Sequence, residues 1–139
     1  MLQLLINIDV DDLVKAVDFY MQALGLRPGR RFGAQGVEML GASSPIYLLA
    51  RQPGTLPFPA AASPREYGRH WTPVHLDMVV ERLEAAMDRA VAAGASFESQ
   101  IEESAWGRIA KMADPFGHGF CLLEFKGRGY DEIAEGSSE

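Results

Sequence analysis

The sequence predicts an α+β domain in which two βαβββ modules pair into a curved mixed sheet around a cavity. The first observation is that segments with strand and helix periodicity follow the order strand, helix, three strands, and that this order occurs twice. The second is that the halves align at an offset of 70 residues, which places Leu5 over His75 and Asn7 over Asp77. One small sheet alone buries too little surface to be stable, so we expect the modules to pair within one domain, 1–126.

The first module is expected within residues 1–51. After an apolar first strand, the helical spacing of Leu13, Ala16, Val17, Tyr20 and Leu24 predicts a helix. Either of two aspartates before it can cap this helix, and the glycine after Leu24 is suited to end it. The two candidate caps and the terminating glycine are Asp11, Asp12 and Gly25. Strands are expected at 2–10, 27–32, 37–42 and 46–51.

Residues 52–72 join the modules and contain four prolines, which excludes a regular helix. The segment is long for a connection within a small domain. It is interpreted as a linker or as a loop that closes over a site. Its end, where Arg65, Arg69 and His70 accompany the aromatic Tyr67 and Trp71, is expected to serve as a lid, a dimer contact or a solvated loop.

The second module is expected within residues 73–126, with a helix over 81–93 that ends at Gly94. The sequence Asp-Pro-Phe-Gly at 114–117 predicts the turn before the last strand. Residues 127–139 form a polar, acidic tail that is expected to fray or to cap a neighbouring element. Strands are expected at 73–80, 97–102, 108–113 and 119–125.

Composition excludes several classes of partner. The chain of 139 residues has 13 Lys and Arg against 19 Asp and Glu, a formal net charge of −6, and no basic cluster. This charge disfavours nucleic acids and anionic membranes, and no apolar run approaches the length of a bilayer span. A lone cysteine, Cys121, cannot form an internal disulfide framework or a cysteine-rich zinc site. We expect a cytoplasmic protein.

Two motifs carry a resemblance to a known family. The stretch DLVKAVDFYMQALG at 12–25 resembles the opening of the vicinal oxygen chelate superfamily, which includes glyoxalases, bleomycin-resistance proteins and extradiol dioxygenases. The stretch ADPFGHGFC at 113–121 resembles the final hairpin of that family. The resemblance covers residues 4–125 and implies paired βαβββ modules and commonly a homodimer.

The resemblance also implies four positions that hold a divalent metal in the family's enzymes. Carried over by motif and by the internal repeat, these positions are Leu5, Tyr47, His75 and Cys121. Only His75 is a good ligand for the ions concerned, since a leucine offers no donor and a cysteine is softer than the family's carboxylate. No family-type metal and no other cofactor is therefore expected, although substitute donors leave a divalent metal possible. Glu124 should point to the opposite face of its strand.

Seven residues are candidates to line the cavity. Asn7, His75 and Asp77 should form a polar cluster at the matching point of both modules, although His75 can also be a core histidine and Asp77 a solvated acid. Cys121 is either a nucleophile beside His75 or a small buried hydrophobe. The catalytic candidates are His75, Asp77 and Cys121, and the ligand-binding candidates are these three with Asn7, Tyr47, Trp106 and Phe116. Trp106 and Phe116 either line the cavity mouth or seal the core.

These residues support three functional hypotheses. The first is a metal-free protein that binds a small apolar or aromatic molecule in its cavity, as the bleomycin-resistance branch sequesters its drug. The second is an enzyme of the superfamily (a lyase, isomerase, dioxygenase or thiol transferase) that uses a substituted metal site or acid–base chemistry by His75 and Asp77. The third is an interaction module with an empty cavity. A small-molecule ligand and a homodimer are expected, without nucleic acid or membrane.

Overall fold

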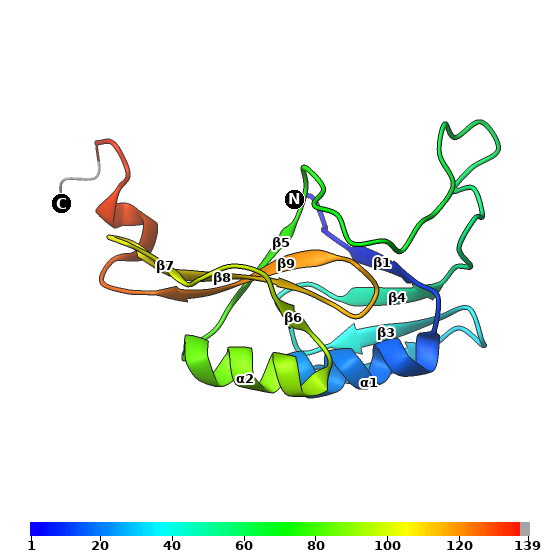
Figure 1. Ribbon diagram of the computed structural model, residues 1–139, viewed down its shortest axis with the longest axis horizontal. Coiled ribbons are helices and arrows are strands. Elements are labelled where there is room, and N and C mark those ends of the chain that lie inside the picture. Colours follow the sequence, from blue (N-terminus) through cyan, green and yellow to red (C-terminus); the bar gives the residue numbers. More distant parts are fainter. Residues whose placement is uncertain (137–139) are drawn as a thin grey trace.

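Two helices lie side by side against one face of two mixed sheets in the computed structural model of the protein, which describes residues 1–136 (Figure 1). This arrangement confirms the predicted α+β fold of two βαβββ modules. The elements of the first module are β1 (Ile6–Val10), α1 (Leu13–Leu24), β2 (Arg27–Arg31), β3 (Gly36–Leu40) and β4 (Ile46–Ala50). Those of the second are β5 (Leu76–Val79), α2 (Leu83–Ala93), β6 (Ser96–Phe97), β7 (Glu102–Ser104), β8 (Gly107–Ala113) and β9 (Gly119–Phe125).

Both sheets repeat one pairing scheme. In the first module the order is β1-β4-β3-β2, with β1 parallel to β4 and the other pairs antiparallel. In the second module the order is β5-β9-β8-β6, with β5 parallel to β9, and β7 also pairs with β8. Asn7 lies opposite Tyr47 in one sheet, and Asp77 lies opposite Cys121 in the other. The internal repeat of the sequence is therefore a repeat of strand register.

The helices cover the inner faces of both sheets. Ile8 and Leu48 of the first sheet and Leu122 of the second belong to a core that the buried faces of α1 and α2 complete. Asp12 caps α1 by accepting a 3.0 Å hydrogen bond from the Lys15 N–H, and Gly25 ends this helix in the left-handed conformation. The opposite face of the sheets, called here the helix-distal face, carries the alternate side chains.

The beginning of α2 depends on a distant residue. Arg82 provides no side-chain cap, and instead the Glu124 carboxylate on β9 accepts a 2.8 Å hydrogen bond from the Leu83 N–H. Glu124 also accepts hydrogen bonds from Arg108. These contacts place Glu124 on the helix side of its strand, as alternation predicts, and they start the helix two residues later than expected.

A buried hydrogen bond joins the modules. The Tyr20 hydroxyl of α1 donates a 2.7 Å hydrogen bond to Asp114 in the turn before β9. The same carboxylate accepts hydrogen bonds of 2.9 Å from the backbone N–H groups of Phe116 and His118, which fixes the turn. Burial, and then the charge of Asp114, raises the pKa of Tyr20 well above its ordinary value, so the phenol stays protonated.

The segment 52–72 runs across the helix-distal side from β4 toward β5 (Figure 1) and is bonded to both modules. Arg65 donates a 2.8 Å hydrogen bond to Asp9 of β1, and the Tyr67 hydroxyl donates one of 2.7 Å to the Arg51 carbonyl. Arg69 forms an ion pair with Glu98, before β7. The segment is therefore a strap anchored through residues 65, 67 and 69, and this is the segment that the sequence leaves open as linker or lid.

Three predicted strands differ from the structure, and one of them is β5, which is shorter than the strand expected at 73–80. The first strand is shorter than 2–10, and the apolar residues before it are exposed. The strand expected at 97–102 is wrong as one element, because β6 and β7 are separate. The break coincides with Glu98, whose carboxylate binds Arg69 and accepts a 2.9 Å hydrogen bond from the Trp71 indole. After β9, a short 3₁₀ turn (Gly129–Glu132) places Tyr130 against Trp106 and Phe125, while residues 137–139 of the predicted tail lie outside the described part.

Candidate functional site

A cavity of about 760 Å³ lies where the two modules meet, and we call it the junction cavity. Its size falls within the range of small-molecule sites in proteins. The apolar side of its wall comes from β1, β5 and β9 through Ile6, Ile8, Leu76, Met78 and Phe120. Its polar groups are Asn7, Asp9, Tyr20, His70, Thr72, His75 and His118. The cavity thus combines an apolar body with a few hydrogen-bonding groups.

The strap forms part of the rim of this cavity. His70 of the strap makes a backbone bridge to His118, and Trp71 packs edge-on against the His75 ring with 5.8 Å between ring centroids. The His118 Nε2 lies 2.7 Å from the Asp9 carbonyl oxygen. His70, Thr72 and Val74 lie in the wall itself. The strap therefore borders the junction cavity together with both sheets.

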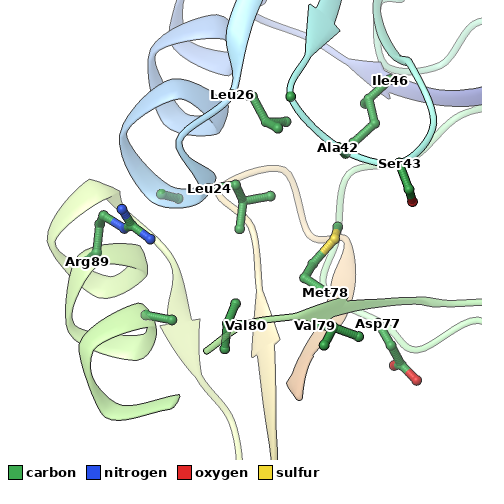
Figure 2. A pocket seen from close by; sticks show the side chains of 13 residues that line it. Leu24, Leu26, Ala42, Ser43, Ile46, Asp77, Met78, Val79, Val80 and Arg89 are labelled. Carbon is green, nitrogen blue, oxygen red and sulfur yellow. The ribbon is translucent and has the colours of Figure 1, made fainter. Parts of the chain in front are cut away.

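A second cavity of about 430 Å³, called here the edge cavity, is lined by the end of α1, by β5 and by α2 (Figure 2). Leu24, Leu26 and Ile46 approach it from the first module, and Met78 and Val80 approach it from β5 and the residue after it (Figure 2). Arg89 of α2 and Asp77 of β5 provide charge at its rim. Because Met78 lines both cavities, β5 is a shared wall.

Three candidate residues come together on the second sheet. The donor atoms of His75, Asp77 and Cys121 all lie within 4.8 Å of one another. The His75 Nδ1 is 3.2 Å from the Asp77 Oδ1, and strand pairing sets Asp77 directly beside Cys121. The His75 and Asp77 side chains are partly exposed, at 41% and 35%, whereas Cys121 is buried. The set is thus open to solvent on one side.

The Cys121 thiol is held in its protonated form. Burial, followed by the neighbouring charge of Asp77 and a hydrogen bond to that carboxylate, raises its pKa to about 11. A nucleophilic cysteine needs a lowered pKa, which this environment opposes. The surroundings of the free thiol match the buried-hydrophobe alternative more closely than the nucleophile.

Tyr47 takes part in a polar cluster that sequence reasoning missed. Its hydroxyl donates a 3.1 Å hydrogen bond to Glu38, which is only 7% exposed. Arg30 binds the same carboxylate through its side chain and its backbone N–H, and these bonds lower the pKa of Glu38 to about 2. No local signal in the sequence predicted this cluster, because strand register in the folded sheet sets Glu38 opposite Tyr47.

The residues at the family's four metal positions do not fit a four-ligand metal site. Leu5 carries no donor atom, and the Tyr47 hydroxyl is engaged by Glu38 and Arg30. Only His75 and Cys121 remain, both in the second module. The chemistry of this donor set therefore does not support the family's metal centre.

The other candidates occupy different places. Asn7 and His75 lie in the wall of the junction cavity, and Asp77 lies in the wall of the edge cavity. Phe116 is buried in the core at 3% exposure, the second of its two alternatives. Trp106 packs against Phe125 and Tyr130 at the far end of the second sheet. Sequence reasoning assigned no role to His118, whose position directly after the Asp-Pro-Phe-Gly turn was the signal for it.

Comparison with known proteins agrees with this architecture. Residues 5–123 match the family model described as Glyoxalase-like domain. The chain is 29% identical to the anthracycline biosynthesis protein DnrV of Streptomyces peucetius over 96% of its own length, but it spans only 44% of that relative. It is 32% identical to an uncharacterized protein of Mycobacterium bovis, covering 81% of this chain and 76% of that one.

Solved structures share the fold at lower identity. A glyoxalase-related enzyme from Fulvimarina pelagi superposes with a TM-score of 0.68 at 17% identity, over 89% of this chain and 87% of that chain. The fosfomycin resistance protein FosX from Listeria monocytogenes superposes with a TM-score of 0.64 at 17% identity, over 87% and 90%.

The fold and these matches define a protein of the vicinal oxygen chelate superfamily. Within it, the chain belongs to the glyoxalase-like domain family. Neither helix within residues 1–136 has the length and apolar character needed to cross a bilayer.

Proposed function

We propose that the protein binds a small, largely apolar or aromatic molecule in the junction cavity, without the four-ligand metal of its family. The observation that carries this proposal is the cavity wall, where apolar side chains from both modules surround a few polar groups. Burial of apolar ligand surface supplies affinity, at about 25 cal/mol per Å², and the polar groups fix the orientation. Asn7 offers such an orienting group.

The class of ligand follows from the wall and from the relatives. The cavity volume of about 760 Å³ accommodates a molecule of several fused rings, and Phe120 presents an aromatic wall for stacking. Relatives at 29% and 30% identity carry names that place them in anthracycline biosynthesis. A planar polycyclic aromatic compound with hydroxyl or carbonyl groups is therefore the preferred probe for this chain.

Fluorescence of Trp71 tests this proposal directly. Of the two tryptophans, Trp71 packs on His75 at the cavity rim, and Trp106 lies elsewhere, so Trp106→Phe leaves a single reporter. We expect a dihydroxyanthraquinone to quench Trp71 saturably in buffer containing EDTA. Isothermal titration calorimetry of the unmodified protein should give one site per chain.

A matched pair of variants locates that site. Val74 and Val14 are both highly exposed, at 81% and 83%, but only Val74 lines the junction cavity. Val74→Phe should weaken binding by about tenfold or more, the equivalent of about 1.4 kcal/mol. Val14→Phe should bind as wild type does. Absence of saturable binding, or equal affinity in both variants, would contradict the proposal.

One observation favours a second candidate function, proton transfer. The 3.2 Å contact between the His75 Nδ1 and the Asp77 carboxylate orients the imidazole as a general base. Its test is deuterium exchange at the acidic C–H groups of small α-hydroxy ketones, followed by NMR in D₂O. His75→Ala should slow that exchange about 100-fold or more. No acceleration by the wild-type protein would exclude this candidate for such substrates.

We also propose that the protein forms a homodimer. On the helix-distal side of the second sheet, Val79 and Phe125 are 60% and 39% exposed, and Leu4 and Leu5 lie exposed just before β1. Exposed apolar groups near open strand edges favour association with a second copy. Light scattering at micromolar concentration should give twice the chain mass of 15.2 kDa. A monomer under these conditions would contradict this proposal.

A further inference from the structure

We propose that His75, Asp77 and Cys121 form a three-donor site for Zn²⁺ that the second module builds alone. This site differs from the family's four-position centre, because it needs no ligand from the first module and because Asp77 is outside those four positions. It also goes beyond the proposed ligand binding, which requires no metal.

The geometry brings three different donor types within reach of one ion. The ligand atoms lie within 4.8 Å of one another, and one pair is already at 3.2 Å. Tetrahedral Zn²⁺, with bonds of about 2.0–2.3 Å, places its ligand atoms about 3.5 Å apart. The Cys121 sulfur is fixed on β9, whereas the partly exposed His75 and Asp77 side chains have room to adjust. Small side-chain rotations therefore complete the site.

The donor chemistry selects the kind of ion. An imidazole nitrogen, a carboxylate oxygen and a thiolate sulfur suit Zn²⁺, and Co²⁺ as its spectroscopic substitute, better than Mg²⁺ or Ca²⁺. On binding, the S–H bond of Cys121 breaks, the sulfur lone pair bonds to the ion, and the proton goes to solvent. One proton is released and no electron is transferred.

The surroundings are compatible with a bound cation. Lys111 lies opposite Cys121 on β8, and its ammonium is paired with the Glu102 carboxylate at 3.4 Å. The Trp71 indole and the His75 ring pack in a T-shaped arrangement with 5.8 Å between ring centroids. Around the Cys121 thiol there are thus two carboxylates, Asp77 and Glu102, and one ammonium, that of Lys111. The exposed side of His75 and Asp77 leaves a coordination position for water.

Cobalt titration tests the site without any organic ligand. Protein freed of metal with EDTA is titrated with Co²⁺, and the thiolate-to-cobalt charge-transfer absorption in the near ultraviolet is followed. We expect one equivalent of Co²⁺ to produce this band and Zn²⁺ to abolish it by displacement. Absence of this charge-transfer band in the wild-type protein overturns the proposal.

Variants distinguish the three donors from adventitious binding. Cys121→Ser should remove the band. Asp77→Asn and His75→Ala should each weaken Co²⁺ binding by at least about 10- to 100-fold, the loss that follows when a metal ligand loses its hydrogen-bond partner. Asp88→Asn on α2 replaces a carboxylate outside the set and outside the junction cavity, so it should bind Co²⁺ as wild type does. Asp77 is exposed, which keeps the test informative if Cys121→Ser fails to fold. A band retained in Cys121→Ser, or an equal loss of binding in Asp88→Asn, overturns the proposal. Anthraquinone binding in EDTA tests the proposed function separately, because that binding requires no metal.

Discussion

The hydroxyl of Tyr20 and the carboxylate of Asp114 form a 2.7 Å hydrogen bond that connects α1 of the first module to the turn before β9 of the second. Tyr20 is 3% exposed and Asp114 is 4% exposed, so neither group exchanges this bond for water. The bond also borders the junction cavity, whose wall includes Tyr20. It is therefore a link between the stability of the domain and the shape of its cavity.

Removal of this hydroxyl should destabilise the domain. Tyr20→Phe retains the ring but deprives a buried carboxylate of one donor, which costs about 1.5–3 kcal/mol for a hydrogen bond to a charged group. The free energy of unfolding, measured by urea denaturation, should fall by this amount. Tyr130→Phe provides the control, because Tyr130 is 51% exposed. Equal stability of Tyr20→Phe and the wild-type protein would contradict the role of the bond.

Glu38 should contribute to stability in a defined range of pH. Its pKa is lowered in the folded protein from 4.5 to about 2 by hydrogen bonds from Arg30. A lowered carboxylate pKa stabilises the fold fully above about pH 4.5, and that contribution disappears as the pH falls toward 2. Glu38→Gln should therefore reduce stability at neutral pH and flatten its decline over this range. Acid titrations followed by circular dichroism measure both effects.

Two features refine the Glu38 experiment. Glu84 has its pKa lowered to about 2 by Arg108, so part of the acid dependence must remain in Glu38→Gln. Glu81→Gln replaces an exposed carboxylate and should follow the wild-type curve. A Glu38→Gln curve parallel to that of the wild-type protein between pH 4.5 and 2 would show that the Arg30 pairing adds nothing.

Gly117 should be required for attachment of the strap. Its φ is +86°, and a Cβ atom at this position would lie 2.6 Å from the Tyr67 carbonyl oxygen. Gly117→Ala should cost about 1–3 kcal/mol in strain and expose the strap to proteolysis. Gly33→Ala is a matched control, since Gly33 also has positive φ, at +59°, but has nothing within 4 Å of the added atom. Equal protease sensitivity in the two variants would exclude a role for the close contact.

Glu124 should stabilise the beginning of α2. Glu124→Gln keeps the size of the side chain but removes the charge that accepts hydrogen bonds from the Leu83 N–H and from Arg108. The expected loss is about 0.5–2 kcal/mol, the range for helix caps. Amide hydrogen exchange should accelerate in the first turn of α2 and remain unchanged in α1. Uniform acceleration in both helices would instead indicate a global loss of stability.

Local signals allowed the sequence to predict most of the fold. Asp12 and Gly25 mark the ends of α1 with side-chain and backbone chemistry that acts within a few residues. The beginning of α2 was not predictable in this way, because Glu124 caps it from a position 41 residues away. The same reason hid the attachment of the strap, where Arg65 reaches Asp9 across 56 residues.

The candidate site was predictable to the extent that strand register determines it. The repeat placed His75, Asp77 and Cys121 at matching points of one sheet, and their donor atoms are neighbours. Burial of Glu38 was not predictable, because a carboxylate in a strand is ordinarily exposed, and its pairing with Arg30 and Tyr47 depends on contacts across three strands.

The position of β5 between two cavities has a thermodynamic consequence. Met78 lines both the junction cavity and the edge cavity. A ligand that moves β5 on entering one cavity must therefore change the affinity of the other cavity for its own ligand. Linkage requires the effect to be reciprocal and equal in free energy. The four-residue strand β5 would then couple the two cavities. Binding of one ligand would change the occupancy of the other site without any contact between the two ligands.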